Sequence, residues 1–341
     1  DKEYLGDLRR LEQRKIFKKV IEYIKENDIK YLFIAGDFYE HNYVKKTTIE
    51  YINNLFKEIP ETKIFISPGN HDPFLKSSYY NKFIWNENVK IFNSKIEKIE
   101  LEDIDIYGFG FDDFYCTNSG IEDIQIENKN KINILVAHGT LDGASLEEKQ
   151  YNSIKSRILK EKGFDYIALG HIHKLDYNTS EKQRIVYPGS LAALGFDEPG
   201  KHGMIVGELD KNNINLEFIP VDETEFKIQN IDVTDIISKE ELVEKLNEIN
   251  FENNNLIEIY LVGKRTFEID SYELYKLIEN DKIIKIKNKT KINYNLEKLS
   301  MENTLRGIFV KKMLEKLNNA ENDNEKEIIE KAIEVGLDSL R

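Results

Sequence analysis

The sequence has few of the features that mark an extracellular, membrane-bound or covalently catalysing protein. It contains one cysteine, Cys116, among 341 residues, which excludes an internal disulfide framework and fits a reducing cytoplasm. No apolar run approaches the roughly 18 residues needed to cross a bilayer. Neither a G-x-S-x-G elbow nor a Walker glycine loop is present. These absences predict a cytoplasmic protein with no membrane partner and no serine or cysteine nucleophile.

Positive charge is also in deficit. The 49 Lys and Arg residues stand against 62 Asp and Glu residues, and the net charge is −13. This argues against a surface coated for nucleic acid, although phosphate contacts need only a local patch. Residues 281–316 hold ten basic against four acidic residues. This stretch is interpreted either as a contact for DNA or a partner, or as a solvated strand and helix face. The second is favoured for 282–291, where Lys alternates with Ile.

Hydropathy patterns predict an α/β protein of more than one domain. Apolar residues recur at helical spacing over 7–27 and 47–56, whereas 31–35 and 63–67 are short apolar runs typical of buried strands. This alternation predicts a sheet sandwich flanked by helices over residues 1–222. Beyond it, strands and a helix that begins at Ser238 predict a smaller α/β domain over 223–292, and 293–341 is predicted as a helical segment.

The histidines are concentrated in a few places. Five of the six fall in the segments GDFYEH, PGNHDP, AHGT and GHIHK, each directly after an apolar run. We expect these segments at the carboxyl ends of strands, where open α/β sheets bind ligands. His, Asp and Asn side chains that meet at one sheet edge predict a metal site, with two metals favoured. The candidate ligands are Asp37, Asn70, His138, His171 and His173.

This mixture of donors suits manganese, iron or zinc better than calcium or magnesium, which prefer oxygen alone. The Asp37 carboxylate can bridge two metals about 3.5–4 Å apart, with a hydroxide between the metals as the expected nucleophile. If GHIHK is extended, His171 and His173 point the same way, because side chains alternate along a strand.

His71 directly follows Asn70 and is expected beside the metals rather than on them. That place suits a general acid, or a positive charge that faces the leaving oxygen. Asp72 is expected to orient His71 by accepting its other N–H.

The motifs and their order resemble those of the calcineurin-like metallophosphoesterases. They are GD, GNHD, AHG and GHIH, followed by YPGSL at 187–191. Within that family the pattern is similar to the SbcD and Mre-type DNA repair nucleases. It is more similar still to a YhaO-like bacterial branch, in which an FDEPGKHG-type stretch recurs at 196–203 here. The resemblance covers roughly residues 7–220.

The resemblance implies a four-layer metallophosphoesterase β-sandwich flanked by helices, with a smaller α/β capping domain and a helical C-terminal tail. It implies two divalent metals, usually manganese, with DNA as substrate and an SMC-type ATPase of the SbcC kind as partner. A homodimer is left open. Asp37 would bridge both metals, Asn70, His138 and His171 would complete one site, His173 would serve the other, and His71 would act on the leaving group.

The implied function is that of a DNA exonuclease or endonuclease subunit in a repair complex. Two alternatives stay open, since one metal centre serves many substrates. The first is a phosphoesterase for a small molecule or nucleotide, and the second is a non-catalytic scaffold of the same fold. The second domain favours a larger substrate, and the intact motif histidines argue against the scaffold.

One family feature is missing from the sequence. The family opens with a strand followed by D-x-H, which supplies two ligands to the first metal, and no D-x-H occurs here. The expectation is a sequence truncated ahead of Asp1 rather than a degenerate site. Only Asp37 and His173 then remain for the first metal. The chain from Asp1 onwards is therefore expected to bind one metal well and to catalyse poorly.

Four further residues are candidates for the rim of the site. His41 is interpreted as a surface or substrate-edge residue, and His202, in the PGKHG turn, is left between loop structure and the rim. Tyr187 and Ser190 are expected to shape the loop next to His173 without direct catalysis.

Overall fold

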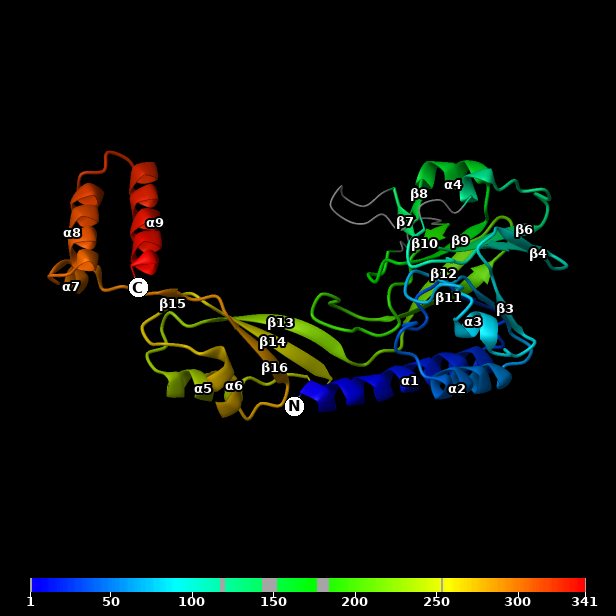
Figure 1. Cartoon of the computed structure of the whole chain (residues 1–341), viewed down its shortest axis with the longest axis horizontal. Coiled ribbons are helices and arrows are strands. Elements are labelled where there is room, and N and C mark those ends of the chain that lie inside the picture. Colours follow the sequence, from blue (N-terminus) through cyan, green and yellow to red (C-terminus); the bar gives the residue numbers. More distant parts are fainter. Residues whose placement is uncertain (1, 117–119, 143–151, 177–183, 253, 341) are drawn as a thin grey trace. The chain divides into compact units, whose positions relative to one another are not determined.

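The chain forms two compact units, Asp1–Phe226 and Lys227–Arg341, each with its own apolar core. Figure 1 labels the elements on the computed structural model of the chain. None of the described helices is both long enough and apolar enough to span a membrane. The structure describes residues 2–116, 120–142, 152–176, 184–252 and 254–340.

Two sheets build the first unit. The smaller is parallel, in the order β1-β2-β3, and its register pairs Ile34 with Ile66. Its strands are β1 (Tyr31–Ile34), β2 (Lys63–Ile66) and β3 (Val89–Ile91). The larger has the order β10-β9-β6-β5-β4 and is parallel except for β4. Its strands are β4 (Glu97–Glu100), β5 (Ile104–Gly108), β6 (Ile132–His138), β9 (Tyr166–Gly170) and β10 (Ile185–Val186).

The two sheets pack against each other through a shared apolar layer. Side chains alternate along β6, so that Ile134 and Val136 face this layer while Leu135 and Ala137 face the opposite side. Residues of both sheets and their connections fill the layer, namely Phe65, Phe92, Ile106, Ile134, Val136 and Ala168. This packing fixes the ends of the strands in one sheet relative to those in the other.

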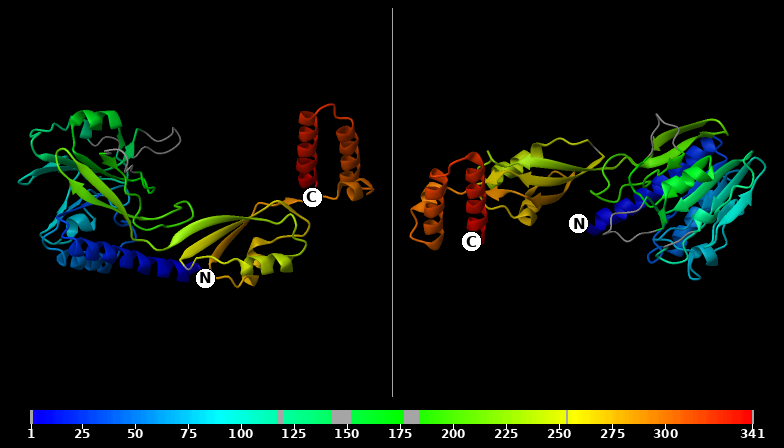
Figure 2. Two further views of the ribbon diagram at one scale, coloured as in Figure 1. Left: turned by 180° about the vertical axis from the view of Figure 1, so that it is seen from behind. Right: turned by 90° about the horizontal axis from the view of Figure 1, so that it is seen from above.

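Helices cover the outer face of each sheet. The helices α1 (Lys2–Glu26) and α2 (Lys46–Lys57) pack on the smaller sheet, and α4 (Ser156–Lys162) packs on the larger one. In Figure 1 and the left view of Figure 2, α1 and α2 lie on one side of the strands and α4 on the other. Buried Ile16, Val20, Ile21 and Ile24 form the apolar stripe of α1.

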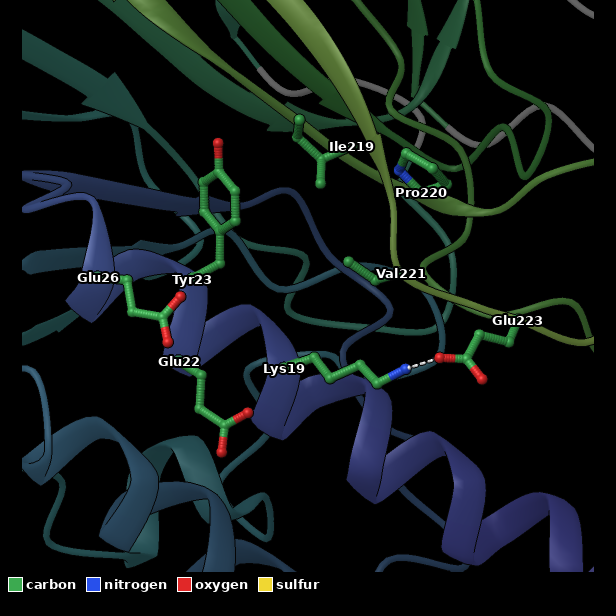
Figure 3. A pocket seen from close by; sticks show the side chains of 8 residues that line it. All are labelled: Lys19, Glu22, Tyr23, Glu26, Ile219, Pro220, Val221 and Glu223. Carbon is green, nitrogen blue, oxygen red and sulfur yellow. Dashed lines mark hydrogen bonds and ion pairs between the residues drawn. The ribbon is translucent and has the colours of Figure 1, made fainter.

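Short elements complete the first unit. They are α3 (Tyr79–Lys82), a 3-10 turn (Ile121–Asp123), the pair β7 (Thr140–Leu141) and β8 (Ser153–Ile154), and the antiparallel pair β11 (Gly203–Leu209) and β12 (Ile214–Pro220). A pocket of about 300 Å³ lies between α1 and the end of β12, and an ion pair from Lys19 to Glu223 spans part of its wall (Figure 3). None of the predicted site residues lines it.

The second unit contains a three-stranded sheet with helices on one face. The sheet order is β13-β14-β16, and Ile257, Ile259 and Leu261 of β14 point into the core beneath the helices. The Ser238 hydroxyl caps α5 by accepting from the Glu241 N–H at 3.2 Å, as predicted. The elements are β13 (Glu225–Asp232), α5 (Lys239–Glu248), β14 (Asn255–Val262), β15 (Lys264–Arg265), α6 (Ser271–Leu277), β16 (Ile283–Asn288) and β17 (Lys291–Ile292).

The lysines of β16 already have partners on the outer face of this sheet. Lys285 and Lys287 pair with the buried carboxylate of Glu258 at 3.1 and 2.9 Å. Lys287 and Lys289 also lie over the ring of Tyr260. These contacts support the interpretation of 282–291 as a one-sided strand whose charged side chains satisfy each other.

The last helices are α7 (Leu296–Ser300), α8 (Leu305–Asn318) and α9 (Asp323–Ser339). Helices α8 and α9 lie side by side as a hairpin (Figures 1 and 2). The apolar side chains of α8 are divided, because Phe309 and Met313 pack in the hairpin core while Leu305 and Ile308 are 72% and 53% exposed.

Most elements agree with the sequence-based prediction, and the mixed α/β class with parallel sheets is confirmed. The strands predicted at 31–35, 63–67 and 165–169 are β1, β2 and β9 within one residue of each end. Of the helix predicted near 146–162, α4 covers Ser156–Lys162, and residues 146–151 lie outside the described part of the chain. The prediction is wrong for 152–155, where Ser153–Ile154 form strand β8 instead.

Replacing Phe92 with Ala is expected to lower the free energy of unfolding of the first unit by about 3–5 kcal/mol, because its ring is fully buried between the two sheets. The sole tryptophan, Trp85, lies in this unit, so its emission in a urea titration follows this unit alone. The matched control is Tyr43→Ala, whose side chain is 82% exposed and should change the value by less than about 0.5 kcal/mol. Equal midpoints for both variants would contradict the packing described.

Candidate metal centre

The four motif segments lie where four strands end. Asp37 follows β1, Asn70 follows β2, His138 is the last residue of β6, and His171 comes directly after β9. The expectation that the segments follow strands is confirmed. The expectation of a single sheet edge is wrong, because β1 and β2 belong to one sheet and β6 and β9 to the other.

Side chains from both sheets meet at short distances. Ligand-type atoms of Asp37, His138 and His171 all lie within 4.8 Å of one another. The Asn70 Oδ1 atom is 2.9 Å from His138 Nε2 and 3.2 Å from His171 Nδ1. His138 Nε2 is also 3.3 Å from Asp37 Oδ2. Four of the five predicted ligands therefore form one cluster, in which His138 is fully buried.

The donor atoms of this cluster fit a metal cation. His138 Nδ1 lies 2.8 Å from the carbonyl oxygen of Ala35, which can only accept, so this nitrogen carries a proton. In the neutral ring, Nε2 then offers a lone pair toward the oxygens of Asn70 and Asp37. Acceptors that face one another in a buried place are unfavourable unless a positive charge lies among them. Two imidazoles with a carboxylate and an amide oxygen suit a transition-metal dication.

The backbone is bent so that these side chains converge. Gly36 and Asp37 have φ angles of 85° and 53°, and His171 has a φ of 101°. Glycine is required at position 36, since a Cβ there would lie 2.4 Å from His138 Nδ1. The positive φ of His171 is unfavourable for a residue with a side chain. The GHIHK segment is therefore not extended past Gly170, and the prediction that His171 and His173 point the same way by strand alternation does not hold.

Asp72 holds the loops that carry Asp37 and Asn70. Its fully buried carboxylate accepts from the backbone N–H groups of Asp37, Phe38 and Gly69 at 2.7–2.9 Å. The Tyr80 hydroxyl also donates to it, at 2.6 Å. Burial, followed by the negative charge of Asp37, raises the pKa of Asp72. Its role in this structure is to join two loops.

His71 is oriented by a different acid from the one expected. Its Nδ1 lies 2.7 Å from Glu40 Oε2, and the ring is more than half exposed. The expectation that Asp72 orients His71 is corrected, because Asp72 already binds three backbone N–H groups and Tyr80. The backbone N–H of His71 donates to Asp37 Oδ1 at 2.9 Å, which places His71 next to the cluster.

The surroundings of the cluster shift the pKa values of His138 and His171 in opposite directions. Burial alone would lower the pKa of His138, but its hydrogen bond with Asp37 and the charge of Asp37 outweigh burial and raise it. Burial would likewise raise the pKa of Asp37, yet His138 and the backbone N–H of His71 lower it. Burial, together with the positive charge on His138, lowers the pKa of His171 to about 4. Of these two histidines, His138 is therefore the one that binds a proton more readily.

His173 is not among the four residues of this cluster, and its ring contacts an acid instead. Its Nδ1 lies 2.5 Å from Glu198 Oε1, and this hydrogen bond is the main reason that the pKa of His173 is raised. Of the rim candidates, Ser190 donates its backbone N–H to His173 O at 2.9 Å, and buried His202 contacts Ser190. Tyr187 is buried and donates to Gly139 O.

His41 lies beside His71 rather than in the cluster. Its backbone N–H donates to His71 O at 2.9 Å. Its ring meets the edge of Phe114 with the ring centres 6.0 Å apart.

The model of the calcineurin-like phosphoesterase family matches residues 5–175, which is half of the chain. This chain belongs to that family. The resemblance drawn from the motifs is confirmed.

Two curated relatives are similar to part of this calcineurin-like phosphoesterase. The uncharacterized metallophosphoesterase YhaO of Bacillus subtilis (strain 168) is 24% identical over 226 residues, which cover 64% of this chain and 55% of the relative. The SbcD component of the nuclease SbcCD of Staphylococcus saprophyticus is 25% identical over 244 residues, which cover 62% of this chain and 63% of the relative. The chain thus spans less than two thirds of the length of either relative.

Two acidic residues of this calcineurin-like phosphoesterase were not predicted from the sequence. Glu40 accepts a hydrogen bond from Nδ1 of His71, and Glu198 accepts one from Nδ1 of His173. Glu40 lies within the GDFYEH segment, so its place near the site was visible while its partner was not. Glu198 lies 25 residues beyond His173. Only the folded loop brings these two residues together.

Manganese binding to this phosphoesterase is expected to strengthen as the pH rises from about 6 to about 8. Because the pKa of His138 is raised above the ordinary histidine value of 6.5, its proton competes with the metal in that range. Titration calorimetry in two buffers of different ionisation enthalpy gives the number of protons released. His171→Ala should weaken binding but keep the proton release, because His171 is already neutral there. Binding with no proton release at pH 7 would contradict the assignment.

Proposed function

We propose that this protein is a metal-dependent phosphodiesterase that cleaves DNA, as the nuclease subunit of an ATPase-containing repair complex. The observation that carries the proposal is the convergence of Asp37, Asn70, His138 and His171 from two sheets onto one point. Membership of the calcineurin-like phosphoesterases supports hydrolysis of a phosphate ester. The similarity to a protein named as part of a nuclease supports DNA as the substrate.

The proposal assigns Asn70, His138 and His171 to one metal, His173 to a second, and Asp37 to both, with manganese as the native ion. Divalent cations in such a pair neutralise the phosphate and activate water for in-line attack. The protein contributes a preset arrangement of donors, since Asp72 fixes the loop of Asp37 and Ala35 fixes the ring of His138. Preset donors lose little freedom when the substrate binds.

His71 is proposed as the group that gives a proton to the leaving oxygen. Its ring is exposed enough to meet a substrate, and its backbone N–H donates to Asp37, so His71 lies next to the cluster. The Glu40 carboxylate, by accepting from Nδ1–H, keeps the opposite ring nitrogen, Nε2, directed outward.

The region beyond the first unit is proposed to limit substrate entry and to bind a partner. Residues 1–222 would form the four-layer sandwich, residues 223–292 the capping domain, and residues 293–341 the segment that binds the partner. The exposed apolar side chains of Leu305 and Ile308 support the second role, since the rest of the α8 stripe is covered by α9. The partner would be an ATPase of the SbcC type, in line with the name of the relative.

An assay with two substrates tests the proposal. With manganese present, the protein is expected to cleave linear duplex DNA as well as a chromogenic phosphodiester, and chelation should abolish both activities. The matched control is Asp37→Asn, which removes the carboxylate shared by the two proposed metals. Cleavage of the small ester without any cleavage of DNA would favour a small-molecule phosphoesterase. Neither activity, together with co-purification of a partner, would favour a scaffold.

His71→Ala is expected to lower kcat by about 10²–10⁴-fold, the usual contribution of a general acid, while leaving manganese affinity unchanged. Glu40→Gln should lower kcat less, because the amide oxygen still accepts from Nδ1–H and keeps the ring in the same direction. His41→Ala serves as the neighbouring control. Unchanged kcat in His71→Ala would remove His71 from the reaction.

A further inference from the structure

The loop between β10 and β11 forms a frame around His173. The Ser190 N–H donates to the backbone carbonyl of His173 at 2.9 Å, and the Glu198 carboxylate binds the ring of His173 through Nδ1 at 2.5 Å. One residue of the loop therefore holds the main chain of His173 while another holds its side chain. The two contacts leave little freedom for the direction of the imidazole.

Glu198 is itself fixed by its surroundings. Its side chain is only 9% exposed, and its Oε2 atom accepts from the Leu194 N–H at 3.0 Å and from the Ser190 hydroxyl at 3.2 Å. These contacts lower the pKa of Glu198 although burial opposes the change. Burying a charged carboxylate is unfavourable unless partners replace the lost water, and here Leu194, Ser190 and His173 do so.

The backbone of Glu198 is fixed as well. The buried ring of His202 lies with Nε2 3.0 Å from Glu198 O and Nδ1 2.8 Å from the Ser190 hydroxyl. His202 thus spans the loop and joins the two residues that hold His173. His202 therefore stabilises the loop, and it contacts the residues that hold His173 rather than His173 itself.

We propose that Glu198 is a positioning residue, which fixes the tautomer and direction of His173 so that Nε2 is presented to a divalent metal. The inference rests on the proposed function, because it takes His173 as a ligand of the second metal. Its physical basis is that a neutral imidazole carries one proton. When Nδ1–H donates to Glu198, the lone pair must lie on Nε2. Carboxylates behind ligand histidines do the same work in other metal sites.

The negative charge of Glu198 also has a use next to His173. A carboxylate behind the ring makes Nε2 a better donor to a cation, and it compensates part of the positive charge that two metals bring. His138 is held instead by the neutral carbonyl of Ala35. The two proposed metal sites therefore differ in the group behind their histidine, and loss of Glu198 should affect only the site that uses His173.

The test uses the full chain and the variants Glu198→Ala, Glu198→Gln and His173→Ala, with Asp197→Asn as the matched control. Asp197 is the neighbour of Glu198 in the chain and undergoes the same change of charge in Asp197→Asn as Glu198 does in Glu198→Gln. Long-range ¹H–¹⁵N spectra of the metal-free protein, recorded above the raised pKa of His173 so that its ring is neutral, report the tautomer of His173, assigned by comparison with His173→Ala. Manganese affinity is measured with Mn²⁺ alone, and Trp85 emission verifies that each variant is folded.

The proposal expects the Nδ1–H tautomer of His173 in the wild type, in Asp197→Asn and in Glu198→Gln, whose amide oxygen still accepts. Glu198→Ala should lose this tautomer preference, and the manganese binding that depends on His173 should weaken by about 10- to 100-fold, with recovery in Glu198→Gln. An unchanged tautomer and unchanged affinity in Glu198→Ala would overturn the role of Glu198 alone. Wild-type manganese binding in His173→Ala would instead overturn His173 as a ligand, and with it the proposed second metal.

Discussion

The contact of His138 with the opposite sheet is the interaction on which the rest of the site depends. Its ring comes from β6 of the larger sheet, yet Nδ1 binds Ala35 O and Nε2 faces Asn70, both from loops of the smaller sheet. The apolar layer between the sheets sets this distance, because close-packed side chains cannot be compressed or separated without cost. The candidate metal centre is therefore a property of the interface between the sheets, not of either sheet by itself.

Acidic groups around this contact have separate duties. Asp72 is buried among backbone N–H groups and joins two loops, whereas Asp37 is partly open and faces the histidines. Glu40 and Glu198 each stand behind an imidazole that is more exposed than His138. Fixed negative charge beside neutral nitrogen and oxygen donors is an electrostatic environment that suits a divalent cation.

The elements of the fold could be predicted closely, since hydrophobic periodicity and caps are local signals. The ends of β1, β2, β6 and β9 placed the motif segments correctly, and the Ser238 cap was recognisable from its spacing to Glu241. The acids that contact the rings of His71 and His173 were not predictable in the same way. Asp72 is next to His71 in sequence, but its side chain points into the core, where four donors meet it.

By itself, the sequence determined the family, the four strand ends and the candidate ligands, because motif spacing and apolar runs are properties of short stretches. The tertiary structure decided that the ligands come from two sheets, that His171 joins the cluster through a left-handed backbone, and that His173 turns to Glu198. These outcomes depend on packing between segments far apart in the chain. No local pattern carries that information, since the same motif fits several loop directions until its neighbours are in place.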